Sequence, residues 1–276
     1  MKPSQLIAGI KKLDPTPQIL PKLQKLLRDP DSSLAELVEL IRIDMSLTAQ
    51  LIRVSNGVGY GSSKKVNSID DAVKRIGYDH VYKVVGAAAS KKVLEDELKI
   101  YGYGEGELWR VSVTCAIAMQ SLAYKMDEDR DTAYTIGLLH GLGMVLIEKY
   151  YHDNGGIEGF SEEMFPISTQ VEDDTLGFTY AEVGSTLLFD WKFLKDVFFP
   201  IKYQDHPHLD PSQKSLSQLL SLTKSTVLQL AYESDIDKFY SNYTVDETML
   251  AELNLTQEDL IDAALNAQDS MSWMTG

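Results

Sequence analysis

Apolar residues at helical spacing are the feature that most limits what this chain can fold into. Between residues 34 and 41 they recur every three or four positions, which places them on one side of an α-helix. Ser33 and Glu36 stand at the two positions of a capping box, so this helix is expected to begin at Ser33. Residues 79–93 repeat the pattern with valines and alanines. This periodicity favours packed helices over paired strands.

The remaining helix signals cover most of the chain. Ser68 opens a short helix that Gly77 is placed to end, because glycine tolerates the left-handed backbone of a helix C-terminus. No Asn-Gly or Asp-Gly turn joins two alternating apolar runs. Further helices are expected at about 107–125, 129–151, 178–191, 194–204 and 212–233, with another capped by Thr244–Glu247 and a last one from Thr256 to about Met271. The sequence thus predicts an all-α fold of two packed helical blocks, an N-terminal bundle (1–100) and a second domain (105–276).

Composition and charge limit the partners. The chain has 276 residues, of which 41 are acidic and 26 basic, giving a net charge of −15. Phosphate backbones and anionic membrane surfaces repel such a chain, which argues against direct nucleic-acid binding. No segment reaches the roughly 18 consecutive apolar residues of a membrane span. The acidic runs at 127–131 and 172–174 are expected at helix starts, where carboxylates meet the positive end of the helix dipole.

The cysteine content and the N-terminal residues indicate a compartment. Cys115 is the single cysteine, so the chain forms no internal disulfide and fits a reducing cytoplasm. Alanines and an isoleucine surround it, which favours a buried helix position over a catalytic thiol. Residues 1–4 lack the apolar core of a secretory signal. We therefore expect a cytoplasmic protein that does not bind membranes.

Residues 137–143, Gly-Leu-Leu-His-Gly-Leu-Gly, carry the most specific chemical signal. They lie in an apolar run, residues 135–147, that is expected to form buried helix. The stretch resembles the signature of the HD superfamily of metal-dependent phosphohydrolases, in which the second position of a His-Asp doublet is a metal ligand. His140 keeps the first position, but Gly141 stands at the second. A carboxylate binds a hard divalent cation, whereas glycine has no side chain with which to bind one.

Motifs in the first hundred residues narrow the resemblance. They follow in the order Pro15–Pro17, Asp29–Leu34, Asp44–Ile52, Ser55–Tyr60, Val66–Val73 and Ile76–Gly77. This order and spacing are similar to the HDOD family, the HD-related output domain of bacterial signalling proteins, over roughly residues 13–210. Met45 and Gly57 depart from the pattern, because the family often has proline and serine there. The resemblance implies that the second block is an HD-like helical domain.

The resemblance also implies that the other metal-ligand positions have changed. An active HD enzyme takes ligands from several helices, and the aligned positions here keep only one of the family's ligands. These vestigial positions are Val111, His140, Gly141, Thr179, Tyr180, Gln204 and Asp205. Since a catalytic metal needs three or more protein ligands, His140 by itself does not hold one. We therefore expect no metal, no cofactor and no hydrolase activity.

Two interpretations of His140 stay open: a core histidine bonded to a neighbouring backbone carbonyl or hydroxyl, or a residue that contacts a ligand. His206 and His208 flank a proline in a loop, where a fortuitous surface metal site competes with an ordinary polar loop. Asn56 is expected to hold the turn before a glycine-rich loop through its amide. That loop lacks the glycine before its lysine that a phosphate-binding loop requires.

Three classes of function follow. The first is a non-enzymatic signalling module that contacts response regulators, kinases or cyclic dinucleotide enzymes, in trans or as a homo-oligomer, as the family resemblance implies. A partner or small ligand would bind a groove between the blocks, near Asn56, Tyr60, Trp109 and His140. The second is a divergent metal-dependent phosphohydrolase acting on nucleotides or cyclic dinucleotides. The third, a nucleic-acid-binding regulator, is disfavoured by the negative charge.

Overall fold

Every regular element in the described part of the chain is helical. The computed structural model describes residues 1–10, 22, 25–26, 33–42, 45–57, 65–212, 214–233 and 235–275. In these ranges the β pairing is limited to one bridge, between Leu98 and Tyr103, so the all-α prediction is confirmed. The elements are α1 (Pro3–Ala8), α3 (Leu34–Arg42), α4 (Met45–Ser55), α5 (Ile69–Ile76), α6 (Tyr78–Leu94), η3 (Lys99–Tyr101), α7 (Glu107–Lys125), α8 (Arg130–Leu139), α9 (Leu142–Asn154), η4 (Glu162–Met164), α10 (Thr169–Leu176), α11 (Tyr180–Asp190), α12 (Lys195–Lys202), η5 (Pro207–Leu209), α13 (Lys214–Tyr232), α14 (Ile236–Asn242), α15 (Glu247–Glu252) and α16 (Gln257–Thr275).

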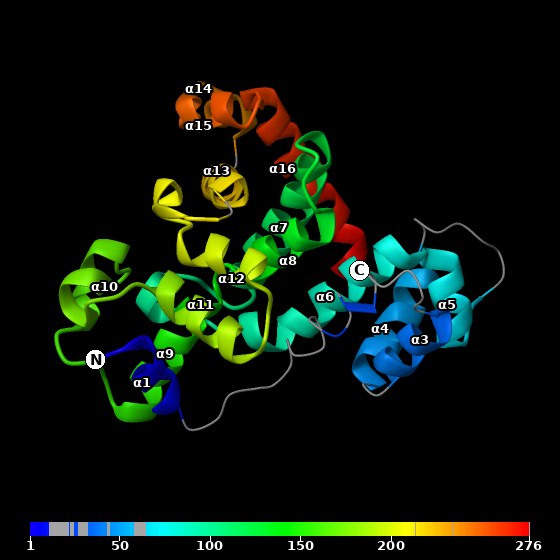
Figure 1. Cartoon of the computed structure of the whole chain (residues 1–276), viewed down its shortest axis with the longest axis horizontal. Helices are drawn as coiled ribbons and strands as arrows, with labels where there is room; N and C mark the ends of the chain where they lie inside the picture. The colour runs from blue at the N-terminus through cyan, green and yellow to red at the C-terminus, as the bar shows by residue number, and fades with distance from the viewer. Residues whose placement is uncertain are drawn as a thin grey trace.

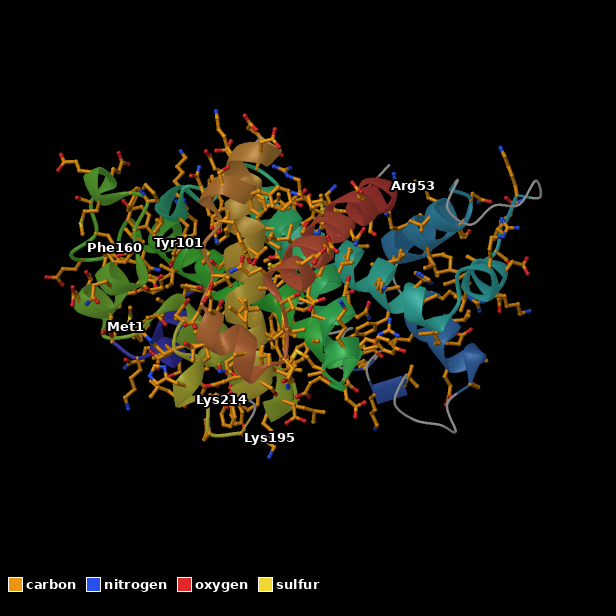
Figure 2. All side chains as sticks on the ribbon, turned by 90° about the horizontal axis from the view of Figure 1, so that it is seen from above. Met1, Arg53, Tyr101, Phe160, Lys195 and Lys214 are labelled. Carbon is orange, nitrogen blue, oxygen red and sulfur yellow. The ribbon has the colours of Figure 1, made fainter. Side chains whose placement is uncertain are left out.

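The helices divide into two ends joined by a central layer (Figure 1). At one end α3, α4 and α5 pack together, and α6 leads from them towards the centre. The centre is formed by α7, α8 and the C-terminal helix α16, which lies along α7. At the other end α1 packs on α9 and α11. Figure 2 shows the result from above, with Met1 and Arg53 at opposite ends of the molecule. The first helix therefore contacts elements of the second predicted block.

Local capping follows the sequence signals. Ser33 and Glu36 form the expected reciprocal box, with the Ser33 amide 2.7 Å from Glu36 Oε2 and the Glu36 amide 3.2 Å from Ser33 Oγ. The Ser68 side chain accepts from the Asp71 amide at the start of α5. Gly77 ends α5 with φ of 81°, a conformation that a residue with a side chain rarely adopts. These predictions are confirmed because caps depend only on residues within one turn.

The expected single helix over 129–151 is wrong, since the structure has two helices there. The chain turns at His140 and Gly141, between α8 and α9. Close packing explains the glycines on either side of the turn: a Cβ at Gly137 would lie 2.7 Å from the Ala116 backbone, and one at Gly143 would lie 1.8 Å from the Tyr180 carbonyl oxygen. Glycine thus lets α8 approach α7, and lets α9 approach α11, more closely than any larger residue would allow.

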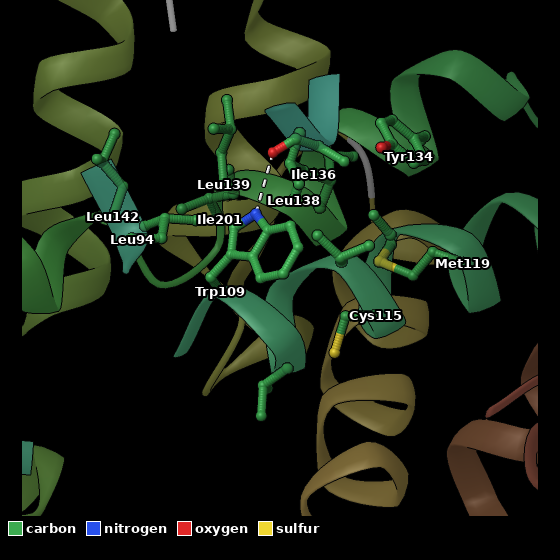
Figure 3. Packing of buried hydrophobic residues seen from close by; sticks show 14 of the residues in the cluster. Leu94, Trp109, Cys115, Met119, Tyr134, Ile136, Leu138, Leu139, Leu142 and Ile201 are labelled. Carbon is green, nitrogen blue, oxygen red and sulfur yellow. Dashed lines mark hydrogen bonds between the residues drawn. The ribbon is translucent and has the colours of Figure 1, made fainter. Parts of the chain in front are cut away.

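The interior is apolar and continuous between the two ends. Figure 3 shows Trp109 of α7 in this core, with a hydrogen bond of 3.0 Å from its indole nitrogen to the Ala87 carbonyl oxygen of α6. Cys115 is fully buried, as expected, and burial raises the pKa of its thiol to about 12. A thiol with this pKa is not a thiolate nucleophile at neutral pH. Among the described helices, none is both long enough and apolar enough to cross a membrane.

Candidate functional site

A lysine from α13 lies at the centre of a buried polar cluster in the second block. Lys224 Nζ is 2.6 Å from Asp205 Oδ1, 3.1 Å from Gln204 Oε1 and 3.0 Å from the Tyr180 hydroxyl. Tyr180 begins α11, whereas Gln204 and Asp205 follow α12. The side chain of Lys224 is only 13% exposed. We call Lys224, Tyr180, Gln204 and Asp205, together with the adjoining His140, the lysine cluster.

Gln204 connects Lys224 to the turn between α8 and α9. Its Nε2 donates to the carbonyl oxygens of His140, at 3.1 Å, and Ile201, at 2.9 Å. Its Oε1 accepts from both Lys224 and the Tyr180 hydroxyl. The carbonyl acceptors fix which end of the amide faces the ammonium group. Every polar atom of this fully buried side chain therefore has a partner.

His140 is a neutral core residue. It is 2% exposed, and its Nδ1 lies 2.7 Å from the Gly137 carbonyl oxygen. Because a carbonyl only accepts, Nδ1 carries the proton in this contact. Burial, aided by the charge of Lys224, lowers the pKa of His140 to about 4. The predicted bond to a neighbouring backbone carbonyl is confirmed.

Lys224 is charged in this site. Burial works to lower the pKa of Lys224, but interactions with Tyr180 and Asp205 outweigh it and raise the pKa above its ordinary value. The ammonium group is thus present at neutral pH. Asp205 uses one oxygen for this pairing, and its buried Oδ2 has no hydrogen-bond partner among the described residues. A cavity of about 290 Å³ opens beside Asp205 and is also lined by Thr179, Tyr203 and His206.

A second buried group, Glu172, lies next to the lysine cluster. Its Oε1 accepts from the Tyr101 hydroxyl, and its Oε2 accepts from the Tyr180 amide at 2.9 Å. Burial raises the pKa of Glu172 to about 7, although both hydrogen bonds favour the carboxylate. We call Glu172, Tyr101 and the Tyr180 amide the glutamate clamp. The prediction that the 172–174 run lies at a helix start is confirmed for Glu172, which is in the first turn of α10, but Ser168 supplies the cap, and Asp173 and Asp174 lie further along the helix.

The vestigial positions divide into two groups. Tyr180, Gln204, Asp205 and His140 meet in the lysine cluster. Thr179 instead caps α11, with its amide 3.4 Å from Glu182 Oε2. Val111 is buried on α7, and Leu108, one turn earlier, faces Gly141: a Cβ on Gly141 would lie 2.7 Å from Leu108 Cδ1. An apolar side chain therefore fills the space beside Gly141.

The residues of the predicted groove have structural contacts of their own. The Asn56 amide donates to the Ile52 and Val66 carbonyl oxygens, at 3.0 and 2.8 Å, and its Oδ1 accepts from the Val66 amide at 2.8 Å. Its predicted role in holding the turn is confirmed. Trp109 and His140 also use their polar atoms within the core. Tyr60 lies outside the described residues, and a groove that binds a partner stays a prediction.

Lys224 itself could have been noticed in the sequence. It follows Leu220 by four residues and precedes Val227 by three, so it lies on the same apolar side of the helix. Both neighbours are buried. A lysine inside such a stripe is rarely buried without a partner. Its partners, however, come from residues 180–205, and helical spacing does not identify them.

The cluster does not fit a catalytic divalent metal. His140 is the one histidine in it, and its Nδ1 is occupied by the Gly137 carbonyl. The ammonium group of Lys224 lies between the three oxygens that a hard cation would use. Among the residues that the structure describes, no three His, Cys, Asp or Glu side chains are grouped to hold a metal ion. His206 and His208 are exposed, with ring centres 6.1 Å apart.

Comparison with known proteins identifies the family to which the chain belongs. Residues 13–207 match the HDOD domain family. The chain belongs to the HDOD family. A relative from Treponema pallidum, an uncharacterized protein, is 26% identical over 241 residues, which are 82% of this chain. This HDOD chain spans only 45% of that relative's length.

Solved structures agree with the HDOD fold. An HDOD domain protein of unknown function from Geobacter sulfurreducens is 18% identical, with a TM-score of 0.72 over 99% of this chain and 94% of its own. A protein from Marinobacter aquaeolei, provisionally named for signal transduction, is 21% identical, with a TM-score of 0.69 over 99% and 65%. One from Shewanella amazonensis, provisionally named a metal-dependent phosphohydrolase, is 19% identical, with a TM-score of 0.62 over 99% of both chains. At these identities the comparisons establish the fold.

Proposed function

We propose that this HDOD protein is a non-enzymatic regulatory module that acts through contacts with other proteins in the bacterial cytoplasm. The observation that carries the proposal is the lysine cluster, where an ammonium group takes the oxygens that a metal would need. Where the protein's own cation takes these oxygens, no metal with an open coordination position is left to activate a substrate. The membership in the HDOD family and the signal transduction name of one structural neighbour support a regulatory role.

An exposed aromatic surface on α11 and α12 supports contacts with a partner. Phe189 and Leu194 are 57% and 52% exposed, large fractions for apolar side chains. Phe189 packs on Phe198 with ring centres 5.7 Å apart, and Phe198 on Phe199 at 5.0 Å. Aromatic residues are enriched in the centres of protein interfaces. We call Phe189, Leu194, Phe198 and Phe199 the aromatic face.

The aromatic face is connected to the lysine cluster through α12. Phe198 and Phe199 are half-buried on α12, whereas Ile201 is fully buried and its carbonyl oxygen accepts from Gln204. A change in the pairing of Lys224 with Asp205 would therefore shift the helix that carries the surface. We propose that a small ligand or partner at the cavity beside Asp205 biases this packing. Response regulators, kinases and cyclic dinucleotide enzymes are the proposed partner classes, and a homo-oligomer is a further arrangement.

Metal content and turnover test the non-enzymatic part of the proposal. Purified protein is analysed for bound Mn, Fe, Mg and Zn, and a generic phosphodiester is offered with each metal at millimolar concentration. We expect less than stoichiometric metal and no hydrolysis above buffer. Stoichiometric metal together with turnover would establish the alternative, a divergent phosphohydrolase acting on nucleotides or cyclic dinucleotides, which the provisional name of the Shewanella neighbour suggests.

Capture of partners tests the contact surface. The native protein and a Phe189→Ser, Phe198→Ser double variant are used as baits in lysate from the source organism, and co-purifying proteins are identified. We expect the double variant to lose specific partners. Tyr232→Ser is the matched control, because Tyr232 is 69% exposed but lies on a different helix, α13, and is not part of the aromatic face. Equal loss with the control, or no loss with the double variant, contradicts a role of the aromatic face.

A further inference from the structure

We infer that Lys224 is a built-in replacement for the metal ion of the HD fold: its ammonium group supplies the positive charge that holds α11, α12 and α13 around the vestigial site. The inference concerns how the site is held together, and it stands whether or not the proposed signalling function is correct. It also predicts a binding site that the Lys224 side chain fills in the native protein. Removal of the lysine side chain should expose a binding site for a small organic cation.

Lys224 contacts three of the vestigial positions. The resemblance to active HD enzymes maps Tyr180, Gln204 and Asp205 onto lost metal-ligand positions. The Lys224 ammonium contacts one oxygen from each of these three residues, all within 3.1 Å. These oxygens come from the start of α11 and from the segment that follows α12. One ammonium group thus joins the start of α11 to the segment after α12, two of the segments that carry the vestigial positions.

The oxygens around Lys224 match the donors of an ammonium group. An ammonium group has three donors, and the phenol, amide and carboxylate oxygens provide three acceptors. A lysine also supplies a positive charge without requiring the histidines that a transition metal prefers. Three other vestigial positions hold a neutral histidine (His140), a glycine (Gly141) and a buried valine (Val111), and neither the glycine nor the valine has a side-chain atom that binds a metal.

The charges of Lys224 and Asp205 balance each other. Asp205 is the carboxylate in contact with Lys224, and in the described part of the chain its buried Oδ2 has no hydrogen-bond partner. Removal of Lys224 would leave the Asp205 carboxylate and Gln204 Oε1 facing a cavity with no cation. Breaking a largely buried ion pair by removing one partner is strongly destabilising because the remaining charge is uncompensated. A cation that enters the cavity would restore the balance.

Chemical rescue of Lys224→Ala tests the inference. The melting temperature of native and variant protein is measured with n-propylammonium, with 1-propanol and with neither, at equal ionic strength. We expect the variant to melt roughly 10 °C below the native protein, from the usual cost of breaking a buried pair in a chain of this size. Propylammonium should recover part of this loss in a saturable way, and should leave the native protein unchanged. Propanol fills the same volume without charge and should recover little.

Lys214→Ala is the matched control. Lys214 lies on the same helix and pairs with Glu252 at the same distance, 2.6 Å, but the two side chains are 48% and 44% exposed. Exposed pairs contribute little to stability, so this variant should melt close to the native protein and show no response to propylammonium. Rescue by propanol equal to that by propylammonium would overturn the inference, because filling the lost volume would then be enough without a charge. An equal response of the Lys224→Ala and Lys214→Ala variants would also overturn it, because the amine would then not act at the lysine cluster.

Two further variants keep the inference testable if Lys224→Ala does not fold. Lys224→Arg retains a cation, whereas Lys224→Met retains the length of the side chain without charge. We expect the arginine variant to melt above the methionine variant and to respond least to added amine. A methionine variant as stable as the native protein would show that the site does not require a cation, and would overturn the inference.

Discussion

The lysine cluster and the glutamate clamp are neighbouring buried polar sites, and they differ in whether the charged form of the central residue is favoured. Both use Tyr180: its hydroxyl contacts Lys224, and its amide contacts Glu172. In the lysine cluster an ammonium meets a carboxylate, and the charged form of Lys224 is favoured despite burial. In the glutamate clamp no cation contacts Glu172 among the described residues, and burial raises its pKa to about 7.

This difference shows that hydrogen bonds alone do not keep a buried carboxylate ionised. Glu172 accepts two hydrogen bonds, from the Tyr101 hydroxyl and the Tyr180 amide, yet desolvation outweighs them. Lys224 is also desolvated, but an opposite charge 2.6 Å away compensates. The lysine cluster should therefore be insensitive to pH near neutrality, whereas the glutamate clamp should titrate there.

The largest expected effect comes from removing the negative charge of the lysine cluster. Asp205→Asn leaves the Lys224 ammonium largely buried without its carboxylate, and should lower the free energy of unfolding by about 4 kcal/mol. The double variant Asp205→Asn, Lys224→Met removes both charges and should recover most of this loss. Urea denaturation at pH 7 measures both. A double variant no more stable than Asp205→Asn would show that the two charges do not compensate each other.

Introducing a carboxylate with no cation beside it should lower the free energy of unfolding somewhat less than Asp205→Asn does. Gly141→Asp places a side chain against Leu108, where a Cβ would already lie 2.7 Å from Leu108 Cδ1. We expect a loss of about 3 kcal/mol from crowding and from burial of a charge. Because Gln204, Tyr180 and Thr179 offer no further metal ligands of the HD type, millimolar Mn²⁺ should not reverse the loss. A variant whose melting temperature rises only with Mn²⁺ would reveal a latent metal site.

The glutamate clamp should make stability depend on pH. The folded pKa of Glu172, about 7, lies above its ordinary value of 4.5, so the folded state binds the proton more tightly. The contribution of Glu172 is therefore most favourable below pH 4.5 and is lost as pH rises towards 7. Glu172→Gln does not ionise, and it should gain about 2 kcal/mol relative to the native protein between pH 5 and pH 8. A constant difference over this range in denaturation experiments contradicts the assignment.

The smallest effect should come from the residue that the two sites share. Tyr180→Phe removes the hydroxyl that Lys224 and Gln204 contact, but it keeps the amide that donates to Glu172. We expect a loss of about 1 kcal/mol, the usual contribution of such a hydrogen bond. The dependence of stability on pH should remain as in the native protein. A change in that dependence would mean that the two sites are coupled through the ring and not only through the backbone.

The sequence predicted the secondary structure well where the signal is local. The caps at Ser33 and Ser68 and the end of α5 at Gly77 each depend on neighbouring residues, and each was found as expected. The helix break at His140 and Gly141 was missed, since apolar periodicity continues through it. The close approach of Gly143 to the Tyr180 backbone, which requires a glycine there, was likewise not predictable, because it involves a helix that is distant along the chain.

The sequence alone determined the helical fold, the family and the loss of the His-Asp doublet, because periodicity, motif order and residue type are properties of neighbouring positions. Packing alone decided which charges meet. Lys224 joined the vestigial positions because α13 packs on α7 and α12, and Glu172 became buried because α10 places it beside Tyr101 and Tyr180. Burial and opposing charge set the protonation of these groups, and both depend on residues that are close only in the folded chain.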